Sequence, residues 1–324
     1  MKEVVDALRP AKRVAIVSHR DPDGDTIGSA VALGLALESL GKTVSLHCAD
    51  PVPSSFTFLR GTERIRSDAP DTDIDVLVTV DLGDIARAKL ALRSGLTLIN
   101  IDHHASNKMF GTINWVDATS AATGEMVGRL IDALGAPWTP AMATATLLAL
   151  MTDTGSFQFP NTDHRALELA AQCISRHADL NGITYNFFRS RRFEAMRLWG
   201  EAFSRMQREE DGQLVWTLVT REDVERSDAK EEDVAGLVEQ LARSTGMRIA
   251  LLFNDQGDGQ VKISCRTVPF QPLVDAAVLM GGFGGGGHAR AAGALVPGSL
   301  DDVKARVLGD ARAALKAARA TTPA

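Results

Sequence analysis

The first half of the chain alternates short, almost uniformly apolar runs with longer segments in which apolar residues recur at helical spacing. Such runs are typical of strands buried on both faces of a parallel sheet. The predicted strands cover 13–18, 43–48, 76–80 and 97–101, and the predicted helices cover 26–40, 121–134, 140–151 and 164–176. This alternation predicts an α/β domain built on a doubly wound, mainly parallel sheet.

The second half has a different pattern, which predicts a smaller α/β domain. A mixed-charge helix over 191–207 leads into it. The predicted strands cover 213–219, 248–253, 260–266 and 288–296, and the predicted helices cover 231–243, 269–280 and 300–318. We therefore expect a catalytic domain over 1–190, a helical linker over 191–211 and a second domain over 212–324, with the active site in the cleft between the domains.

Composition narrows the classes of function. No apolar stretch of the 324 residues approaches the roughly 20 residues that cross a bilayer, so we expect no membrane contact. Three widely spaced cysteines form neither a disulfide framework nor a zinc motif, which favours a cytoplasmic protein. A net charge of −6 argues against a protein that coats long nucleic acid, but allows a small anionic substrate held by local cations.

Carboxylates and imidazoles follow the predicted strands of the first half. Each has an ordinary explanation when taken singly, such as a surface turn for the Asp-Pro-Asp-Gly-Asp segment. However, the carboxyl ends of parallel strands meet at one edge of the sheet, where ligands bind. The residues in such positions are His19, Asp23, Asp25, Asp81, Asp102, His103, His104 and, after an apolar helix, Asp153.

These side chains limit the metal that they can bind. Aspartates with one or two neutral imidazoles and no thiolate suit manganese, magnesium or iron better than structural zinc. The set is too large for one tetrahedral site, but it is about right for two octahedral ions that share a bridging carboxylate. Two such ions can activate water and brace both oxygens of a phosphoryl displacement.

The second half contains a run of glycines from Gly281 to Gly287 that ends at His288. Its literal G-x-G-x-x-G spacing does not indicate a dinucleotide-binding fold, because the run follows a helix and precedes a strand, the reverse of the required order. The run favours a loop that presents backbone N–H groups to an oxyanion, with Arg266 as a second, permanently charged phosphate contact. A hinge loop with a surface histidine is the alternative.

Together these segments resemble the DHH phosphoesterases, a family named for the triplet found here at Asp102-His103-His104. The segment from His19 to Asp25, Asp81 and Asp153 stand where that family has its other metal motifs. The glycine run followed by Ala291-Ala292-Gly293 is similar to the signature of the DHH-associated C-terminal domain. Length and domain content are most similar to the NrnA group of oligoribonucleases, which also act as phosphatases on 3′-phosphoadenosine 5′-phosphate.

The resemblance implies a role for each position. His19 and Asp23 would hold one Mn²⁺ ion, and Asp25, His103 and Asp153 a second, with Mg²⁺ as a substitute. Asp81 would bridge the two ions. Asp102 would be a ligand or support one, and His104 would act beside the water or scissile phosphate. The residues expected to bind the substrate are Arg266, Gly286, Gly287 and His288.

The resemblance implies a manganese-dependent phosphoesterase acting on short single-stranded RNA or DNA, linear dinucleotides or a nucleotide 3′-phosphate. It allows a homodimer. Two alternatives remain at this point: a hydrolase similar to family II inorganic pyrophosphatases, which share the metal motifs, and a non-catalytic module that binds a nucleotide. Substrate length, cleavage polarity and the preference for RNA or DNA stay open.

Overall fold

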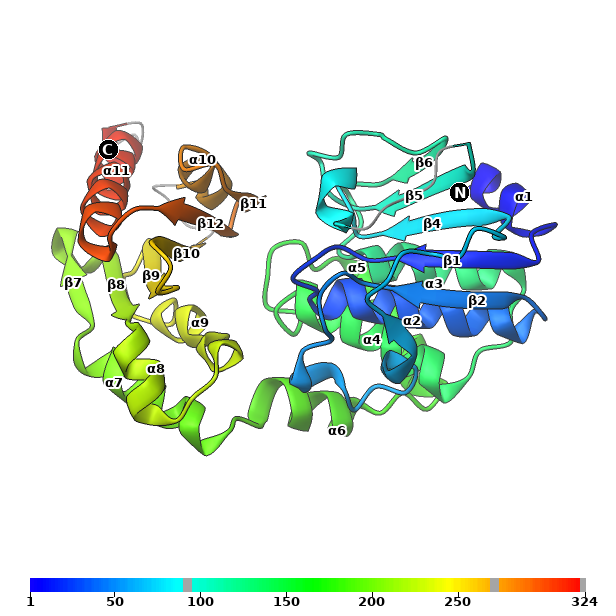
Figure 1. The fold of residues 1–324 in the computed structure, drawn as a ribbon, viewed down its shortest axis with the longest axis horizontal. Helices are drawn as coiled ribbons and strands as arrows, with labels where there is room; N and C mark the ends of the chain where they lie inside the picture. Colours follow the sequence, from blue (N-terminus) through cyan, green and yellow to red (C-terminus); the bar gives the residue numbers. More distant parts are fainter. Residues whose placement is uncertain (90–94, 269–273, 321–324) are drawn as a thin grey trace. The chain divides into compact units, whose positions relative to one another are not determined.

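The computed structural model describes residues 1–89, 95–268 and 274–320 (Figure 1). The chain forms two compact units, Met1–Ser190 and Arg191–Ala324. In the described part of the chain, every helix is too short or too polar to span a membrane.

The first unit is built on a six-stranded sheet in which all neighbouring strands are parallel, as predicted. The order is β3-β2-β1-β4-β5-β6, so the direction of winding reverses between β1 and β4. The strands are β1 (Arg13–Val17), β2 (Thr43–His47), β3 (Ile65–Arg66), β4 (Val76–Val80), β5 (Thr97–Asp102) and β6 (Ile113–Val116).

Side chains alternate between the two faces of this sheet. Val14 and Ile16 of β1 join the large core beneath the helices on one face, whereas Ala15 and Val17 join a smaller cluster on the other. That second face is covered at Ala88 by the 3-10 helix η3 (Ile85–Ala88) of the β4–β5 connection. The helices of the unit are α1 (Lys2–Leu8), α2 (Gly24–Ser39), α3 (Thr123–Leu134), α4 (Pro140–Asp153), α5 (His164–Ser175) and α6 (Leu180–Ile183), with the short turns η1 (Ser54–Phe56), η2 (Thr62–Arg64) and η4 (Thr184–Arg189).

Glycines let helix α2 lie directly against helix α4. A Cβ atom at Gly28 would stand 2.4 Å from the carbonyl oxygen of Ala145, and one at Gly24 would stand 2.3 Å from the side chain of Thr152. No larger residue fits at Gly28 without moving backbone. This close packing brings the start of α2, which carries Asp25, beside the end of α4, which carries Asp153.

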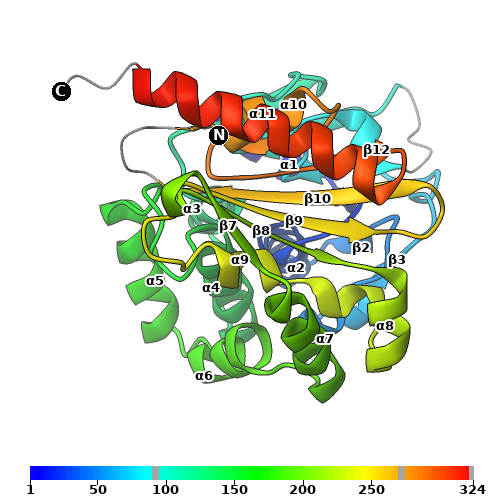
Figure 2. The same cartoon turned by 90° about the vertical axis from the view of Figure 1, so that its left-hand side faces the viewer.

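The second unit contains a mixed six-stranded sheet in the order β11-β12-β10-β9-β8-β7, in which only β8 and β9 pair in parallel. Its core divides into a cluster shared with α10 and α11 and a cluster shared with α7, α8 and α9, so helices cover both faces (Figure 2). The elements are α7 (Phe193–Ser204), β7 (Gln207–Glu209), η5 (Glu210–Gly212), β8 (Leu214–Val219), α8 (Arg221–Ser227), η6 (Glu231–Val234), α9 (Leu237–Leu241), β9 (Ile249–Asp255), β10 (Gln260–Thr267), α10 (Ala276–Gly281), β11 (Gly286–His288), β12 (Ala291–Pro297) and α11 (Leu300–Ala320).

Three predicted elements of this unit differ from the structure. The helix expected over 231–243 is broken into η6 and α9 because Gly236 has a left-handed φ of 89°. The strand expected over 288–296 is divided between β11 and β12, which pair with each other. Of the helix expected over 269–280, only Ala276–Gly281 is seen, and residues 269–273 lie outside the described residues.

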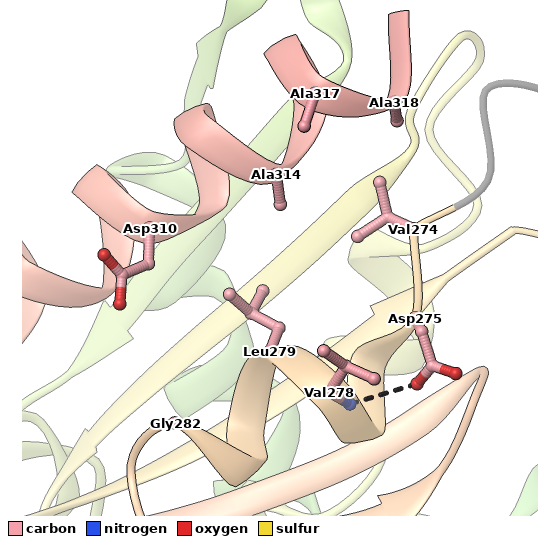
Figure 3. A pocket seen from close by; sticks show the side chains of 9 residues that line it. All are labelled: Val274, Asp275, Val278, Leu279, Gly282, Asp310, Ala314, Ala317 and Ala318. Atoms are coloured by element: carbon pink, nitrogen blue, oxygen red, sulfur yellow. Dashed lines mark hydrogen bonds between the residues drawn. The ribbon is translucent and has the colours of Figure 1, made fainter. Parts of the chain in front are cut away.

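A groove of about 440 Å³ lies between α10 and α11 (Figure 3). Its lining is mainly alanine, valine and leucine, with Asp275 and Asp310 as the charged members. Among the described residues, the lining of this groove includes no lysine, arginine or histidine.

Candidate metal centre

The predicted ligands of the first unit meet at the carboxyl edge of its sheet. His19 follows β1 and Asp81 follows β4, the two strands between which the winding reverses. This switch point is where open α/β sheets bind ligands. Asp102 ends β5 and is followed by His103. Asp25 lies in the first turn of α2, and Asp153 is the last residue of α4.

The side chains form two adjacent groups. In the first group, donor atoms of His19, Asp23 and Asp81 all lie within 4.8 Å of one another, and in the second those of Asp25, His103 and Asp153 do so. Asp81 also faces the second group, because its Oδ1 atom is 3.7 Å from Nε2 of His103. Asp81 is therefore placed between the two groups.

The two candidate imidazole ligands are oriented in the same way. Nδ1–H of His19 donates to the carbonyl of Arg20 at 2.6 Å, and Nδ1–H of His103 donates to the carbonyl of Ser120 at 3.3 Å. A carbonyl oxygen can only accept, so Nδ1 carries the proton and Nε2 is directed at the carboxylates. A backbone partner on the far nitrogen is the usual arrangement of a metal-binding histidine.

Asp25 is held from three directions. Its carboxylate accepts hydrogen bonds from the backbone N–H groups of Thr123 (2.7 Å) and Gly124 (2.8 Å) at the start of α3, and from the hydroxyl of Ser29 (3.0 Å). These bonds fix the carboxylate while Oδ2 faces Nε2 of His103 at 3.8 Å.

The carboxylates repel one another when no cation is present. Burial raises the pKa of Asp25 well above its ordinary value, and the charges of Asp81 and Asp153 raise it further. Burial and the charges of Asp81 and Asp23 raise the pKa of Asp153 in the same way. Asp153 also ends a helix, where the dipole disfavours negative charge. Burial opposes ionisation of Asp81 as well, but its contacts with His19 and His104 hold its pKa well below the usual range.

This donor set fits divalent cations. Carboxylate oxygens and neutral imidazole nitrogens suit manganese and magnesium, and a bound ion would offset the repulsion that raises the pKa of Asp25 and Asp153. His19, Asp23 and Asp81 would hold one ion. Asp25, His103 and Asp153 would hold the other.

His104 and Asp102 form a separate pair beside Asp81. Nδ1–H of His104 donates to Oδ1 of Asp102 at 2.7 Å, and the side-chain amide of Asn107 donates to Oδ2 at 2.5 Å. Asp102 is fully buried, and one of its carboxylate oxygens also lies within 4.8 Å of donor atoms of Asp81 and His104, so its position fits both a ligand role and a supporting role. Burial would lower the pKa of His104, but the bond to Asp102 and the charge of Asp81 raise it to about 9.

Asp102→Asn is expected to move the alkaline limb of the pH profile of kcat/KM to lower pH, by about 1–3 units. The hydrogen bond from Nδ1–H to the charged Asp102 favours the protonated ring, so His104 loses its proton at lower pH when that charge is removed. Hydrolysis of bis-p-nitrophenyl phosphate at saturating metal, followed from pH 6 to 10, measures the limb. An unchanged limb would show that Asp102 does not set the protonation of His104.

The residues predicted to bind substrate lie in the second unit. Arg266 in β10 is engaged by Glu239 of α9, which accepts from its Nη2 at 2.5 Å and its Nε at 3.1 Å. Gly286, Gly287 and His288 form the exposed strand β11. Gly287 has φ of 139°, and a Cβ there would stand 2.5 Å from the carbonyl oxygen of Ala291, so this glycine lets β11 lie against β12.

Several residues of the site were missed by sequence reasoning. Ser29, Thr26 and Thr123 donate hydroxyl groups to the carboxylates, Asn107 supports Asp102, and Glu239 pairs with Arg266. Ser29 falls four residues after Asp25, a helical spacing that could have indicated it, whereas Thr26 donates its hydroxyl to Asp81, 55 residues away. No local signal could have indicated Thr123, which lies 98 residues from Asp25.

The fold and the site define a two-unit α/β protein whose first unit carries clustered carboxylates and imidazoles that could hold divalent metal ions. Residues 13–152 match the DHH family, N-terminal domain, and residues 211–320 match the DHHA1 domain. The chain is 34% identical to the bifunctional oligoribonuclease and PAP phosphatase NrnA of Thermus thermophilus, over 95% of this chain and 92% of the relative. This chain belongs to the DHH family of phosphoesterases, and the resemblance noted in its motifs is confirmed.

Other relatives agree with this assignment. The protein of the same name from Bacillus subtilis is 24% identical over 91% of this chain and 92% of its own length. The crystal structure of an exopolyphosphatase-related protein from Bacteroides fragilis superposes with a TM-score of 0.88, covers 97% of both chains and is 24% identical. That likeness concerns the fold alone.

Proposed function

We propose that this protein is a divalent-metal-dependent phosphoesterase that hydrolyses short oligonucleotides, linear dinucleotides and 3′-phosphoadenosine 5′-phosphate. The observation that carries the proposal is the pair of adjacent ligand groups, one of which contains Asp81 while the other faces it through His103. The substrate class is supported by the relatives named as oligoribonuclease and PAP phosphatase, which align over nearly the whole chain. The DHHA1 match over the second unit favours this class over an inorganic pyrophosphatase.

We propose manganese as the metal, with magnesium as a substitute. Paired divalent ions supply a water nucleophile of lowered pKa and neutralise charge on the phosphate. The chain's own residues provide the rest. Asp81 lies between the two ligand groups. Asp102, which accepts a hydrogen bond from Asn107, orients the ring of His104. The bond from Nδ1–H to the charged Asp102 favours the protonated ring of His104, which can donate a proton to the phosphate or to the leaving oxygen.

Arg266, Gly286, Gly287 and His288 are proposed to bind the distal phosphate of the substrate. Arg266→Ala and His288→Ala are expected to raise KM for oligonucleotides about tenfold or more, and to leave KM for bis-p-nitrophenyl phosphate within about twofold, because the small diester has no distal phosphate. Steady-state kinetics on both substrates give the comparison. Arg243→Ala, at an arginine on the same unit outside this set, serves as the control. Equal effects on both substrates would contradict a role in binding a distal phosphate.

One panel tests the function. Purified protein with Mn²⁺ is given RNAs of two to ten nucleotides, 3′-phosphoadenosine 5′-phosphate and pyrophosphate, and the products are separated by chromatography. The expected result is hydrolysis of the short RNAs and of 3′-phosphoadenosine 5′-phosphate, with little phosphate released from pyrophosphate. Turnover of pyrophosphate alone would favour the pyrophosphatase, and binding without hydrolysis of any member would favour a nucleotide-binding module.

The cellular location and the oligomeric state of the protein are further predictions. We propose a cytoplasmic enzyme, since all three cysteines are buried and free of disulfides. The homodimer allowed by the family resemblance is checked by size-exclusion chromatography with light scattering.

A further inference from the structure

Two buried threonines each donate a hydroxyl hydrogen bond to a different oxygen of Asp81. Oγ1 of Thr26, at the start of α2, lies 2.6 Å from Oδ2, and Oγ1 of Thr123, at the start of α3, lies 3.1 Å from Oδ1. Both threonines have no exposed surface. Asp81 itself has a left-handed φ of 56°, a conformation that is costly for a residue other than glycine and is retained where the surroundings enforce it.

The same threonines hold one further ligand each through their backbone N–H groups. Thr26 donates to Oδ1 of Asp23 at 2.9 Å, and Thr123 donates to Oδ2 of Asp25 at 2.7 Å. Asp23 belongs to the first ligand group and Asp25 to the second. Each threonine therefore ties Asp81 to one of the two groups.

The hydroxyls restrict how Asp81 can bind metal. A carboxylate oxygen has two in-plane acceptor sites, so one hydroxyl on each oxygen leaves one site on each. Oδ2 lies 3.4 Å from Nε2 of His19, and Oδ1 lies 3.7 Å from Nε2 of His103 and 3.5 Å from Nδ1 of His104. The two hydroxyl bonds oppose rotation of the carboxylate, so they hold Oδ2 toward the first ligand group and Oδ1 toward the second.

We propose that Thr26 and Thr123 are positioning residues that make Asp81 a bridge, with one oxygen for each of two metal ions. This inference rests on the proposed two-metal function. Without the hydroxyls the carboxylate can turn and bind one ion through both oxygens, so the second ion loses its shared ligand. The threonines thus set the number of ions that the centre retains, and they act through Asp81 without contact with substrate.

The test measures metal binding directly. Thr26→Val and Thr123→Val keep the shape of the side chain and remove the hydroxyl, whereas Thr26→Ser and Thr123→Ser keep the hydroxyl. Mn²⁺ is titrated into each metal-free protein by calorimetry, and electron paramagnetic resonance separates spin-coupled ion pairs from isolated ions. Thr146→Val is the matched control, because Thr146 is a fully buried threonine about two turns before Asp153 with no hydrogen-bond partner for its hydroxyl among the described residues.

The wild type and Thr146→Val are expected to bind two ions with a spin-coupled spectrum. The valine variants should bind the second ion about 10–100-fold more weakly and show mainly the spectrum of isolated Mn²⁺, and the serine variants should return to within about threefold of the wild type. Circular dichroism of the metal-free proteins checks the fold. If a valine variant does not fold, Thr26→Ala and Thr123→Ala, which avoid steric conflict, take its place with the same expectation.

Two outcomes separate this inference from the proposed function. Valine variants that bind two spin-coupled ions with the wild-type affinities would overturn the role of the threonines and leave the two-metal function standing. A wild type that binds a single ion, or none, would refute the two-metal function itself, and with it the inference.

Discussion

Asp81→Asn is expected to lower kcat/KM by about 10³-fold or more on every substrate that the protein hydrolyses. Asp81 faces both groups, with His19 on one side at 3.4 Å and His103 on the other at 3.7 Å. An amide keeps the size of the side chain, but loses the charge and one of the two acceptor oxygens. A factor of 10³ corresponds to about 4 kcal/mol, the scale of charge stabilisation that bound metal supplies.

Single-turnover and steady-state assays with a short RNA and with bis-p-nitrophenyl phosphate measure this loss. Asp6→Asn, at an exposed aspartate of helix α1, is the control and should keep wild-type activity. Retention of more than about a tenth of wild-type kcat/KM in Asp81→Asn, at saturating Mn²⁺, would contradict the bridging role.

Addition of Mn²⁺ to the metal-free protein is expected to release protons and to raise the free energy of unfolding. The pKa of Asp25 and of Asp153 is raised well above 3.8 by burial and by the other carboxylates. At pH values between the pKa of these carboxyl groups in the unfolded chain and their higher pKa in the folded protein, the folded, metal-free protein binds protons that the unfolded chain has lost. Its free energy of unfolding therefore decreases as the pH rises through this range. A bound cation displaces these protons and removes that pH dependence.

Titration calorimetry in two buffers of different ionisation enthalpy counts the released protons. Thermal unfolding with and without the ion gives the stabilisation, about 4 kcal/mol when the free ion is 1,000 times its Kd. Asp153→Asn should release fewer protons than the wild type and be more stable without metal, because it removes one of the repelling charges. Binding heats that are identical in both buffers would show that these carboxylates are already ionised.

The strands of the first sheet were predictable because strands buried on both faces need nearly continuous apolar runs. β4 begins and ends where the pattern placed it, at Val76 and Val80. β6 was missed because all four of its residues are only half-buried, so that no apolar run marks it. Gly236 was visible in the sequence, but whether a glycine interrupts a helix depends on its φ, which the spacing of apolar residues does not specify.

The convergence of the candidate ligands was predictable for a related reason. Strand-end positions of a parallel sheet converge whatever the length of the intervening chain, so His19 and Asp81 could be paired from the pattern alone. The burial of Asp25 rules out the alternative of a simple surface turn for its segment. The residues that orient the ligands could not be found in this way. Thr123 reaches Asp81 through the packing of α3 against α2, and that contact depends on tertiary structure.

The central claim, two metal ions joined by Asp81, is tested most directly by a crystal grown with Mn²⁺ and measured for anomalous scattering. The account predicts two anomalous peaks, one within coordinating distance of His19, Asp23 and Asp81, and the other within coordinating distance of Asp25, His103 and Asp153, with Asp81 contacting both. A single peak that both groups surround, or peaks away from these side chains, would contradict it.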